Sequence, residues 1–261
     1  MNTPLLSLII PTFNERGSIG PLLAELDEAL VGTVWEAVFV DDSTDGTDAI
    51  IAGLSQTDPR VQLLHRTENR GGLAGAVVDG LAHARGTYLC VLDADLQHPP
   101  ARIPDMLTAA REARADVVIA SRYVPGGSAS GLDGPLRQLY SRGLKRLSQA
   151  VFPRRLATIT DPLGGYFLLH RSVVNGADLR PIGYKILLEI LVRCRWQTAR
   201  EVAYRFQPRQ HGTSKADFRQ GLRFLHHLAA LAWDCSPALA LARIVAGQPA
   251  SAAPHTGNLG A

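Results

Sequence analysis

The chain has 261 residues, of which 46% are hydrophobic and 20% are charged, and this ordinary globular composition predicts one main core. A net charge of +3 is too small to indicate nucleic-acid binding, and we expect no nucleic-acid partner. The three cysteines, Cys90, Cys194 and Cys235, are widely spaced, which suits a reducing compartment and excludes a disulfide framework or a CxxC site. Because the first residues lack the basic and apolar stretches of a secretory signal, we expect a cytoplasmic protein.

Short apolar runs alternate with helical patterns along the first half of the chain, which predicts an α/β fold with a mainly parallel sheet and helices on both faces. Helices are expected at 19–30 and 72–84, and strands at 5–10, 35–40, 61–65, 87–92 and 116–120. Polar or acidic clusters follow three of these strands, at 12–15, 41–43 and 93–95. Since parallel strands end at the same edge of a sheet, these clusters are expected to meet there.

The most informative cluster is Asp93-Ala94-Asp95-Leu96-Gln97, where the apolar run 88–92 stops abruptly. Carboxylate and amide oxygens are the ligands that hard cations prefer. We therefore predict that a divalent metal, Mg²⁺ or Mn²⁺, is bound by Asp93, Asp95 and Gln97. So few protein ligands leave coordination positions for the phosphate oxygens of a nucleotide diphosphate. For this segment alone, a surface turn with incidental acids is the alternative.

Six stretches in register carry a resemblance to a known family. They are Ile9-Ile10-Pro11-Thr12-Phe13-Asn14-Glu15, Val40-Asp41-Asp42-Ser43-Thr44-Asp45-Gly46-Thr47, Asn69-Arg70-Gly71, Asp93-Ala94-Asp95-Leu96-Gln97-His98-Pro99, Ser121-Arg122-Tyr123 and Gly212-Thr213-Ser214-Lys215. With these stretches, the chain resembles GT-A fold glycosyltransferases of family 2, specifically polyprenyl-phosphate (dolichol-phosphate-like) mannosyl- or glycosyltransferases. It departs from the family pattern at Gly164-Gly165, where a Ser-Gly pair is expected, and in having no membrane span after Lys215.

The resemblance implies a nucleotide-sugar donor, with GDP-mannose favoured. It assigns nucleotide-sugar contacts to Pro11, Thr12, Asn14, Glu15, Asp41, Asp42, Asn69, Asp93, Ala94 and, on a mobile loop over the donor diphosphate, Arg209 and Lys215. Asp42 suits guanine N–H groups or ribose hydroxyls, because a carboxylate only accepts hydrogen bonds. Helix capping, together with Ser43 and Thr44, is the alternative role of Asp41 and Asp42. For the loop, a surface segment with incidental charge is the alternative.

The resemblance also implies an acceptor, a polyprenyl monophosphate that attacks the anomeric carbon with inversion while the metal stabilises the leaving nucleoside diphosphate. A phosphate monoester has a second pKa of about 6, so it is mostly dianionic at neutral pH and needs no catalytic base. The segment 134–160 contains six Arg and Lys residues and no acidic residue, and its apolar spacing predicts an amphipathic helix. The acceptor phosphate is assigned to Arg122, Arg137 and Ser141, and catalysis to Asp95, Arg122 and Arg137. A solvated cationic face is the alternative for this helix.

We predict three parts: a catalytic domain at 1–216, two amphipathic membrane-interface helices within 217–246, and a flexible tail at 247–261. The first of these helices has an apolar stripe formed by Phe218, Leu222, Leu225, Ala229 and Trp233. Charged residues and a proline interrupt the apolar stretch that follows, which disfavours a spanning helix. We expect a peripheral enzyme at the cytoplasmic face of the membrane, with a homodimer contact or core packing as alternative roles for the helices. The rival functions are a UDP-sugar-dependent transferase of glucose or a modified sugar and a catalytically silent nucleotide-sugar-binding subunit.

Overall fold

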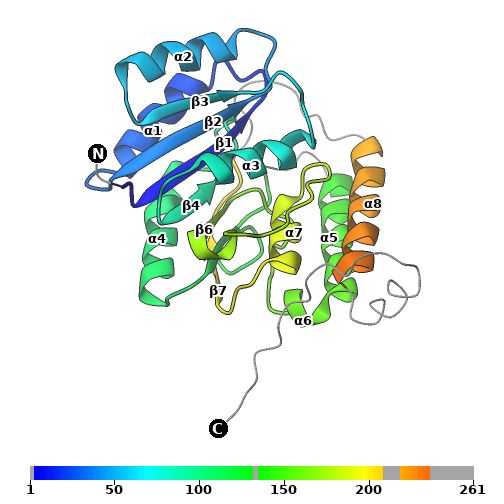
Figure 1. Cartoon of the computed structure of the whole chain (residues 1–261). Helices are drawn as coiled ribbons and strands as arrows, with labels where there is room; N and C mark the ends of the chain where they lie inside the picture. The colour runs from blue at the N-terminus through cyan, green and yellow to red at the C-terminus, as the bar shows by residue number, and fades with distance from the viewer. Residues whose placement is uncertain (1–2, 132–134, 208–217, 236–261) are drawn as a thin grey trace.

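The computed structural model describes the main chain of residues 3–131, 135–207 and 218–235, and the side chains of 3–131, 141–207 and 220–235. Within these residues, a seven-stranded sheet with the order β3-β2-β1-β4-β6-β5-β7 lies between two layers of helices (Figure 1). All strands run in one direction except β6, which is antiparallel to β4 and β5. The predicted mainly parallel α/β fold is therefore confirmed. The strands are β1 (Leu6–Thr12), β2 (Trp35–Asp41), β3 (Val61–His65), β4 (Tyr88–Val91), β5 (Val117–Ser121), β6 (Phe167–His170) and β7 (Ala199–Ala203).

Successive residues of each strand face opposite sides of the sheet, and this alternation divides the helices into two layers. Leu8 packs with α1, α2 and α4 on one face, whereas Ile9 packs with α3, α6, α7 and α8 on the other. The helices are α1 (Ile19–Ala29), α2 (Thr47–Thr57), α3 (Gly72–His83), α4 (Ile103–Glu112), α5 (Pro135–Val151), α6 (Pro153–Leu156), α7 (Ile186–Arg193) and α8 (Phe218–Cys235), with short 3₁₀ turns η1 (Pro100–Arg102) and η2 (Arg171–Val173).

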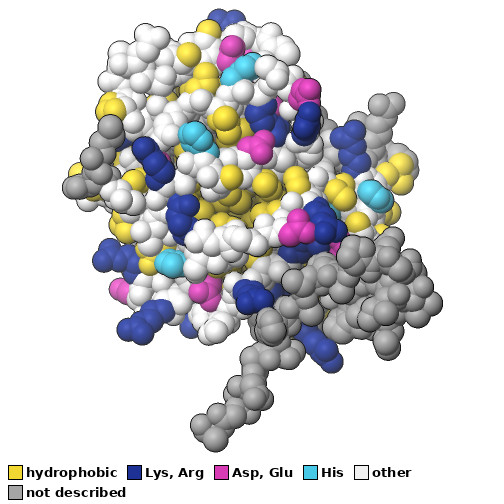
Figure 2. Space-filling view, viewed as in Figure 1, with side chains coloured by type: hydrophobic (Ala, Val, Ile, Leu, Met, Phe, Trp, Pro, Cys, Tyr) yellow, Lys and Arg dark blue, Asp and Glu magenta, His cyan; other side chains and the backbone are white. Residues whose placement is uncertain are grey.

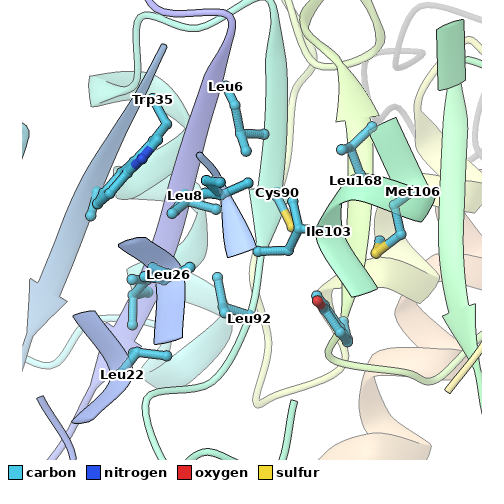
Figure 3. Close-up of a cluster of buried hydrophobic side chains, with 14 of the residues drawn as sticks. Leu6, Leu8, Leu22, Leu26, Trp35, Cys90, Leu92, Ile103, Met106 and Leu168 are labelled. Atoms are coloured by element: carbon cyan, nitrogen blue, oxygen red, sulfur yellow. The ribbon is translucent and has the colours of Figure 1, made fainter. Parts of the chain in front are cut away.

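The core beneath α1 and α4 fixes the strands that carry the candidate site. Figure 3 shows Leu8 of β1 and Cys90 of β4 meeting Leu26 of α1 and Ile103 of α4, all fully buried. Burying one such leucine or isoleucine side chain contributes about 1.5–3 kcal/mol. Leu92, just beyond β4, is also fully buried in this cluster, so the start of the acidic loop is held by the core.

The strands β1 and β4 diverge at their carboxyl ends. They pair only as far as Ile9 and Val91, whereas β1 and β2 stay paired to Thr12 and Asp41. Pro11, predicted to end the first strand, instead lies within β1. The backbone nitrogen of Pro11, like that of Ile9, is on the side of β1 next to β4, but pairing with β4 has already ended at Ile9. The missing N–H of proline therefore breaks no hydrogen bond of the sheet. Because the chain order reverses between β1 and β4, this is the switch point at which open α/β sheets bind ligands.

Helix α8 has two apolar faces. Phe224, Leu228 and Leu231 are buried in the same cluster as α7, whereas Leu222 and Trp233 are exposed. The predicted boundary between 216 and 217, the predicted second interfacial helix and the tail at 247–261 lie outside the described residues. In the described part of the chain, no helix combines the length and apolar character that crossing a membrane requires.

Candidate active site

The acidic loop after β4 brings the three predicted metal ligands together in five residues at the carboxyl edge of the sheet. Asp95 is almost fully buried, and the Asp93 side chain is 34% exposed. The loop turns through Leu96, which has a φ of 63°, and the Gln97 amide N–H donates to Asp95 Oδ1 at 3.1 Å. Gln97 Nε2 donates to the Gln207 carbonyl oxygen at 3.0 Å, which leaves Gln97 Oε1 as the acceptor end of the amide.

His98 supports this loop from below. Its Nδ1 accepts a hydrogen bond from the Asp93 amide at 3.0 Å, and its ring stacks on Tyr166 at a centroid distance of 5.1 Å. Burial lowers the pKa of His98 to about 4, against the opposing charge of Asp95, so the ring is neutral at pH 7. The 3.7 Å approach of Nδ1 to Asp93 Oδ2 is therefore no ion pair. This arrangement agrees with a supporting role for His98.

The oxygens of this loop fit a hard divalent cation. Two carboxylates and one amide oxygen from Asp93, Asp95 and Gln97 form a donor set that suits Mg²⁺ or Mn²⁺, and it leaves positions for phosphate oxygens. No group of three or more His, Cys, Asp or Glu side chains with metal-binding geometry occurs among the described residues. A metal held by this loop would therefore need the amide oxygen of Gln97 in addition to the carboxylates.

Asn14, a predicted nucleotide contact, joins the loop after β1 to the loop after β2. It adopts a left-handed conformation with a φ of 58°, which asparagine tolerates well. Its amide N–H donates to Ser43 Oγ at 2.8 Å, and its Oδ1 accepts from the Thr44 amide at 2.9 Å. The Glu15 amide donates to Thr47 Oγ1 at 3.2 Å. The two loops thus form one surface at the ends of β1 and β2.

The two adjacent aspartates after β2 have different partners. Asp41 is fully buried and accepts from Ser43 Oγ at 2.5 Å and from His65 Nδ1 at 3.1 Å, so it holds the loop. Asp42 forms a two-point ion pair with Arg66, in which Nε donates to Oδ1 at 2.7 Å. Helix α2 begins at Thr47 with Gly46 at its N-cap, so neither aspartate caps it and that alternative is wrong.

Arg66 organises the turn at 69–72. Its guanidinium donates to the carbonyl oxygens of Arg70 and Gly72 and forms an ion pair with Asp79. Burial alone lowers the pKa of Arg66, but the hydrogen bonds that its guanidinium donates to Asp42 and Asp79 raise it above its ordinary value. Asn69, the predicted nucleotide contact in this turn, is exposed.

A cleft of about 570 Å³ lies beside this turn, between α3 and the segment after β3. It includes Arg66, the partner of Asp42, but neither Asp93 nor Asp95, so the predicted metal ligands do not line it. On the face of the molecule drawn in Figure 2, hydrophobic patches occupy the middle and Lys and Arg side chains lie around them. The cleft is lined by His65, Arg66, Thr67, Glu68, Arg70, Gly71, Gly75, Val78, Asp79 and Pro181.

Across the edge, Arg122 follows β5 and is held by Asp161. Its Nε and Nη2 donate to the two carboxylate oxygens of Asp161, each at 2.8 Å, and both side chains are buried. Burial lowers the pKa of the Arg122 guanidinium, but Asp161 raises it well above its ordinary value, so Arg122 is charged. The guanidinium carbon also lies 5.7 Å from the centre of the Phe206 ring. Because the next residue, Gln207, bonds Gln97, one short segment contacts both Arg122 and the acidic loop.

Helix α5 brings the polar side chain of Ser141 next to Tyr123, the residue that follows Arg122. Ser141 Oγ lies 3.2 Å from the hydroxyl of Tyr123, and Lys145 Nζ lies 4.4 Å from the centre of the same ring. Arg137 is four residues before Ser141 in α5, which places both on one face of the helix, although its side chain lies outside the described residues.

The predicted loop over the donor starts beside the acidic loop. Gln207 donates its amide N–H to the Gln97 carbonyl oxygen at 3.1 Å. Arg209, two residues further on, and Lys215 lie outside the described residues. The structure therefore places the beginning of this segment, and the positions of both cations stay a prediction.

Two charged residues near the site were not predicted from the sequence. Asp161 is the first acidic residue after the basic segment 134–160, and this position was the available signal. Lys185, just before α7, donates to the Leu163 carbonyl oxygen at 2.8 Å. Lys185 and Arg122 both lower the pKa of His98, which places the two cations within electrostatic range of one imidazole.

The departure at Gly164-Gly165 leaves the site intact. A Cβ atom at Gly164 would make ordinary contacts of 3.5 Å or more with Asp161, so the serine of the family pattern would also fit. A Cβ atom at Gly165 would lie 3.2 Å from His98 Cε1 and 3.6 Å from Asp93 Oδ2. Glycine at this second position therefore allows the turn to pack closely against the acidic loop.

Comparison with known proteins decides the family. Residues 7–176 match the family model described as Glycosyl transferase family 2. The chain belongs to this family. The glycosyltransferase is 39% identical to a dolichol-phosphate mannosyltransferase of Pyrococcus furiosus, over 85% of this chain and 62% of that protein. It is 34% identical to an undecaprenyl-phosphate mannosyltransferase of Micrococcus luteus, over 79% of this chain and 85% of that protein. It thus spans less than two thirds of the Pyrococcus relative.

Solved structures confirm the GT-A fold of this family 2 glycosyltransferase. A glucosyl-3-phosphoglycerate synthase from Mycobacterium tuberculosis, in complex with Mn²⁺ and UDP, matches with a TM-score of 0.61 and 19% identity. The match covers 95% of this chain and 82% of that chain. At this identity, the similarity shows the fold alone.

Proposed function

We propose that this glycosyltransferase transfers mannose from GDP-mannose to a polyprenyl monophosphate, with inversion at the anomeric carbon. One observation carries the proposal: Phe206 contacts Arg122 while Gln207 bonds Gln97, so a candidate phosphate-binding arginine and the acidic loop belong to one site. The names of the relatives, which act on dolichol phosphate and undecaprenyl phosphate, support this acceptor class. A UDP-sugar donor and a catalytically silent nucleotide-sugar-binding subunit are the outcomes that the test below separates.

We assign the donor side to the ends of β1, β2 and β4. Asp93, Asp95 and Gln97 would hold Mg²⁺ or Mn²⁺, which neutralises the charge that develops on the departing nucleoside diphosphate. The solved Mycobacterium synthase binds Mn²⁺ together with UDP, which supports a divalent metal in this fold. Residues Pro11, Thr12, Asn14, Glu15, Asp42, Asn69 and Ala94 line the nucleotide side, Asp41 fixes their loop, and Arg209 and Lys215 bind the diphosphate.

We assign the acceptor phosphate to Arg122, Arg137 and Ser141. A dianionic phosphate monoester is already the nucleophile, so its attack requires no base. It must approach a second anion, the donor diphosphate, and positively charged donors lower the repulsion between the two. Asp95, Arg122 and Arg137 therefore act by electrostatics and orientation rather than by proton transfer. The neutral His98 fits this mechanism, since it supports Asp93 instead of accepting a proton from the acceptor.

We propose that the protein binds the cytoplasmic face of a membrane, where a polyprenyl phosphate presents its headgroup. The exposed face of α8 carries Leu222, Leu225 and Trp233, which are 54%, 46% and 40% exposed, with Arg223 and His226 beside them. An apolar helix face with basic flanks suits the interface of an anionic bilayer. Cys90, Cys194 and Cys235 are present as thiols rather than disulfides, which suits a reducing compartment. A second copy of the chain on the same face is the competing occupant.

A panel of labelled nucleotide sugars tests the function. Purified protein would receive GDP-mannose, UDP-glucose or UDP-N-acetylglucosamine with undecaprenyl monophosphate and Mn²⁺ or Mg²⁺, and the labelled glycolipid would be measured after extraction. The proposal predicts a mannolipid from GDP-mannose only. A product from a UDP-sugar alone would show that the donor is that UDP-sugar and not GDP-mannose. Binding of nucleotide sugars without any product would support a catalytically silent subunit.

A further inference from the structure

We propose that Asp161 and Glu201 are positioning residues that set the orientation of Arg122 and its spacing to Ser141 for binding the acceptor phosphate. This inference rests on the proposed function, because it assumes that Arg122 binds a lipid monophosphate. Neither acid belongs to the acidic loop after β4 or to the nucleotide side. Asp161 accepts hydrogen bonds from Arg122 directly, and Glu201 accepts one from the main-chain amide of Asp161.

The first step is the geometry of the Arg122–Asp161 pair. The two carboxylate oxygens of Asp161 accept from Nε and Nη2, so the pair uses one side of the planar guanidinium. A third hydrogen bond joins the Arg122 amide to Asp161 Oδ2 at 3.2 Å. Because a guanidinium carries five N–H groups in a rigid fork, the Nη1 group lies outside this pair, and the proposal assigns it as a donor to the phosphate. Asp161 thus determines which side of Arg122 faces the acceptor.

The second step is the support of Asp161 by the edge strand β7. Glu201 Oε1 accepts from the Asp161 amide at 3.1 Å and from the Thr160 hydroxyl at 2.9 Å. The Thr160 amide donates to both carboxylate oxygens of Glu201, at 2.9 and 3.0 Å. Four hydrogen bonds to one carboxylate fix the main chain at 160–161, from which Asp161 reaches Arg122.

The same hydrogen-bond network extends to Ser141, which is also assigned to the acceptor phosphate. Thr160 Oγ1 lies 2.6 Å from Ser121 Oγ, which accepts from the Tyr123 amide at 3.1 Å. The Tyr123 hydroxyl then reaches Ser141 in α5 at 3.2 Å. Glu201 therefore supports both the residue that holds Arg122 and the path to Ser141. Such support is what a bidentate phosphate site needs, since small misorientation weakens charge-assisted hydrogen bonds.

Charge and orientation predict opposite effects of removing the Asp161 carboxylate on phosphate binding. Replacing Asp161 by Asn makes the region around Arg122 more positive, which by charge alone would strengthen binding of a phosphate dianion. Positioning predicts the reverse, because the guanidinium loses the partner that orients it. The direction of the change in acceptor KM therefore separates orientation from net charge.

The test compares Asp161→Asn and Glu201→Gln with Asp116→Asn in the full chain. Asp116 is a matched control: its carboxylate accepts from the amides of Gln197 and Thr198 at the opposite end of β5. KM values for undecaprenyl monophosphate and for the nucleotide-sugar donor would be measured, together with donor hydrolysis without acceptor. We expect Asp161→Asn to raise the acceptor KM at least 10-fold and Glu201→Gln about 3-fold. Donor KM and hydrolysis should change less than 2-fold, and Asp116→Asn should change none of these values.

An acceptor KM that is unchanged or lower in Asp161→Asn, or an equal rise in both KM values, would overturn the inference. If Asp161→Asn does not fold, Glu201→Gln decides in the same way, because its amide keeps one acceptor oxygen for the network. A wild-type protein that transfers no sugar to the lipid phosphate would overturn the proposed function and this inference with it. If the wild type transfers sugar to the lipid phosphate and both variants keep its acceptor KM, this inference is overturned but the proposed function stands.

Discussion

Polar side chains at the carboxyl edge of the sheet are held by other side chains before any substrate binds. His98 holds the Asp93 amide, Arg66 holds Asp42, and Asp161 holds Arg122. These partners keep the site in one geometry, so little reorganisation is required when charge develops during transfer. The residues that we assign to substrate binding thus depend on neighbours that have no such assignment.

Replacing His98 by Phe tests this dependence at one residue. Phenylalanine keeps a ring against Tyr166 but removes the acceptor of the Asp93 amide. Loss of an outer partner typically weakens metal binding about 10–100-fold. We expect at least a 10-fold loss of Mn²⁺ affinity in the presence of GDP, measured by electron paramagnetic resonance, with the melting temperature as a control for folding. Unchanged affinity in a folded variant would show that His98 does not position the loop.

The sequence identified most residues at the edge but not their partners. Because strand ends are visible as apolar runs that stop at polar residues, Asp42, Asp93 and Asp95 could be placed together before the structure. The Arg66–Asp42 and Arg122–Asp161 pairs join residues 24 and 39 positions apart. No local pattern encodes such contacts, so only the fold reveals them.

At the scale of elements, helix α5 presents different residues to the site and to solvent. Ser141 faces Tyr123, and Arg137 occupies the same helix face one turn earlier, whereas Arg142 is exposed. Arg137→Ala should therefore raise the KM for undecaprenyl monophosphate about 10-fold, as expected for loss of a charge-assisted hydrogen bond of about 1.5–3 kcal/mol. Arg142→Ala is the matched control and should change it less than 2-fold. Equal effects of the two changes, or an equal rise in donor KM, would contradict the assignment.

A second element-level prediction concerns Glu36, which is buried at the other end of the sheet. It accepts from Ser7 Oγ at 2.6 Å, Arg85 N at 2.7 Å and Gln62 Nε2 at 2.7 Å, joining β1, β2, β3 and the turn before β4. Burial raises the pKa of Glu36, but the hydrogen bonds from Ser7 and Arg85 bring it below its ordinary value of 4.5.

Because the folded pKa is lowered, the stabilisation by the Glu36 carboxylate is present above pH 4.5 and is lost as the pH falls below it through the folded value. Glu36→Gln should reduce the free energy of unfolding by about 1–3 kcal/mol at pH 7. Urea denaturation should show this difference shrinking between pH 5 and pH 3. A difference that stays constant over this range would contradict a charged Glu36.

The elements themselves were predictable where the apolar pattern is strong. β3 has the predicted bounds, and β2 and α3 differ from prediction by one residue at one end. The pattern did not identify β7, since two of its five residues, Arg200 and Glu201, are charged. The reversed direction of β6 was also not predictable, because strand direction depends on the long connection 122–166 and not on the strand's own residues.

At the scale of the molecule, α8 packs one face against the core and exposes the other face to solvent. Its buried face holds His227, whose Nε2 lies 3.1 Å from Glu189 of α7, and its exposed face is apolar. The stripe predicted from the sequence, which includes Leu222, Leu225 and Trp233, is the exposed one. One helix can therefore pack on the protein and face a bilayer at the same time.

Substituting the exposed stripe tests membrane binding. The variant L222Q/L225Q/W233Q should lose at least 10-fold in affinity for vesicles that contain anionic lipid, because insertion of these side chains drives interfacial binding. The control V31Q/V34Q changes two exposed valines, 84% and 54% exposed, in the turn before β2 and should bind like the wild type. Co-sedimentation measures both, and retained binding by the triple variant would exclude this face as the anchor.

The central claim is that the acidic loop after β4 binds a divalent metal together with a nucleoside diphosphate. The most direct measurement is electron paramagnetic resonance of Mn²⁺ titrated with protein, with and without GDP, for the wild type, Asp95→Asn and Asp116→Asn. We predict GDP-dependent binding of one Mn²⁺ by the wild type and by Asp116→Asn, and at least a 10-fold weaker affinity for Asp95→Asn in a folded protein. Equal Mn²⁺ affinity in all three proteins, or no effect of GDP on the wild type, would contradict the account.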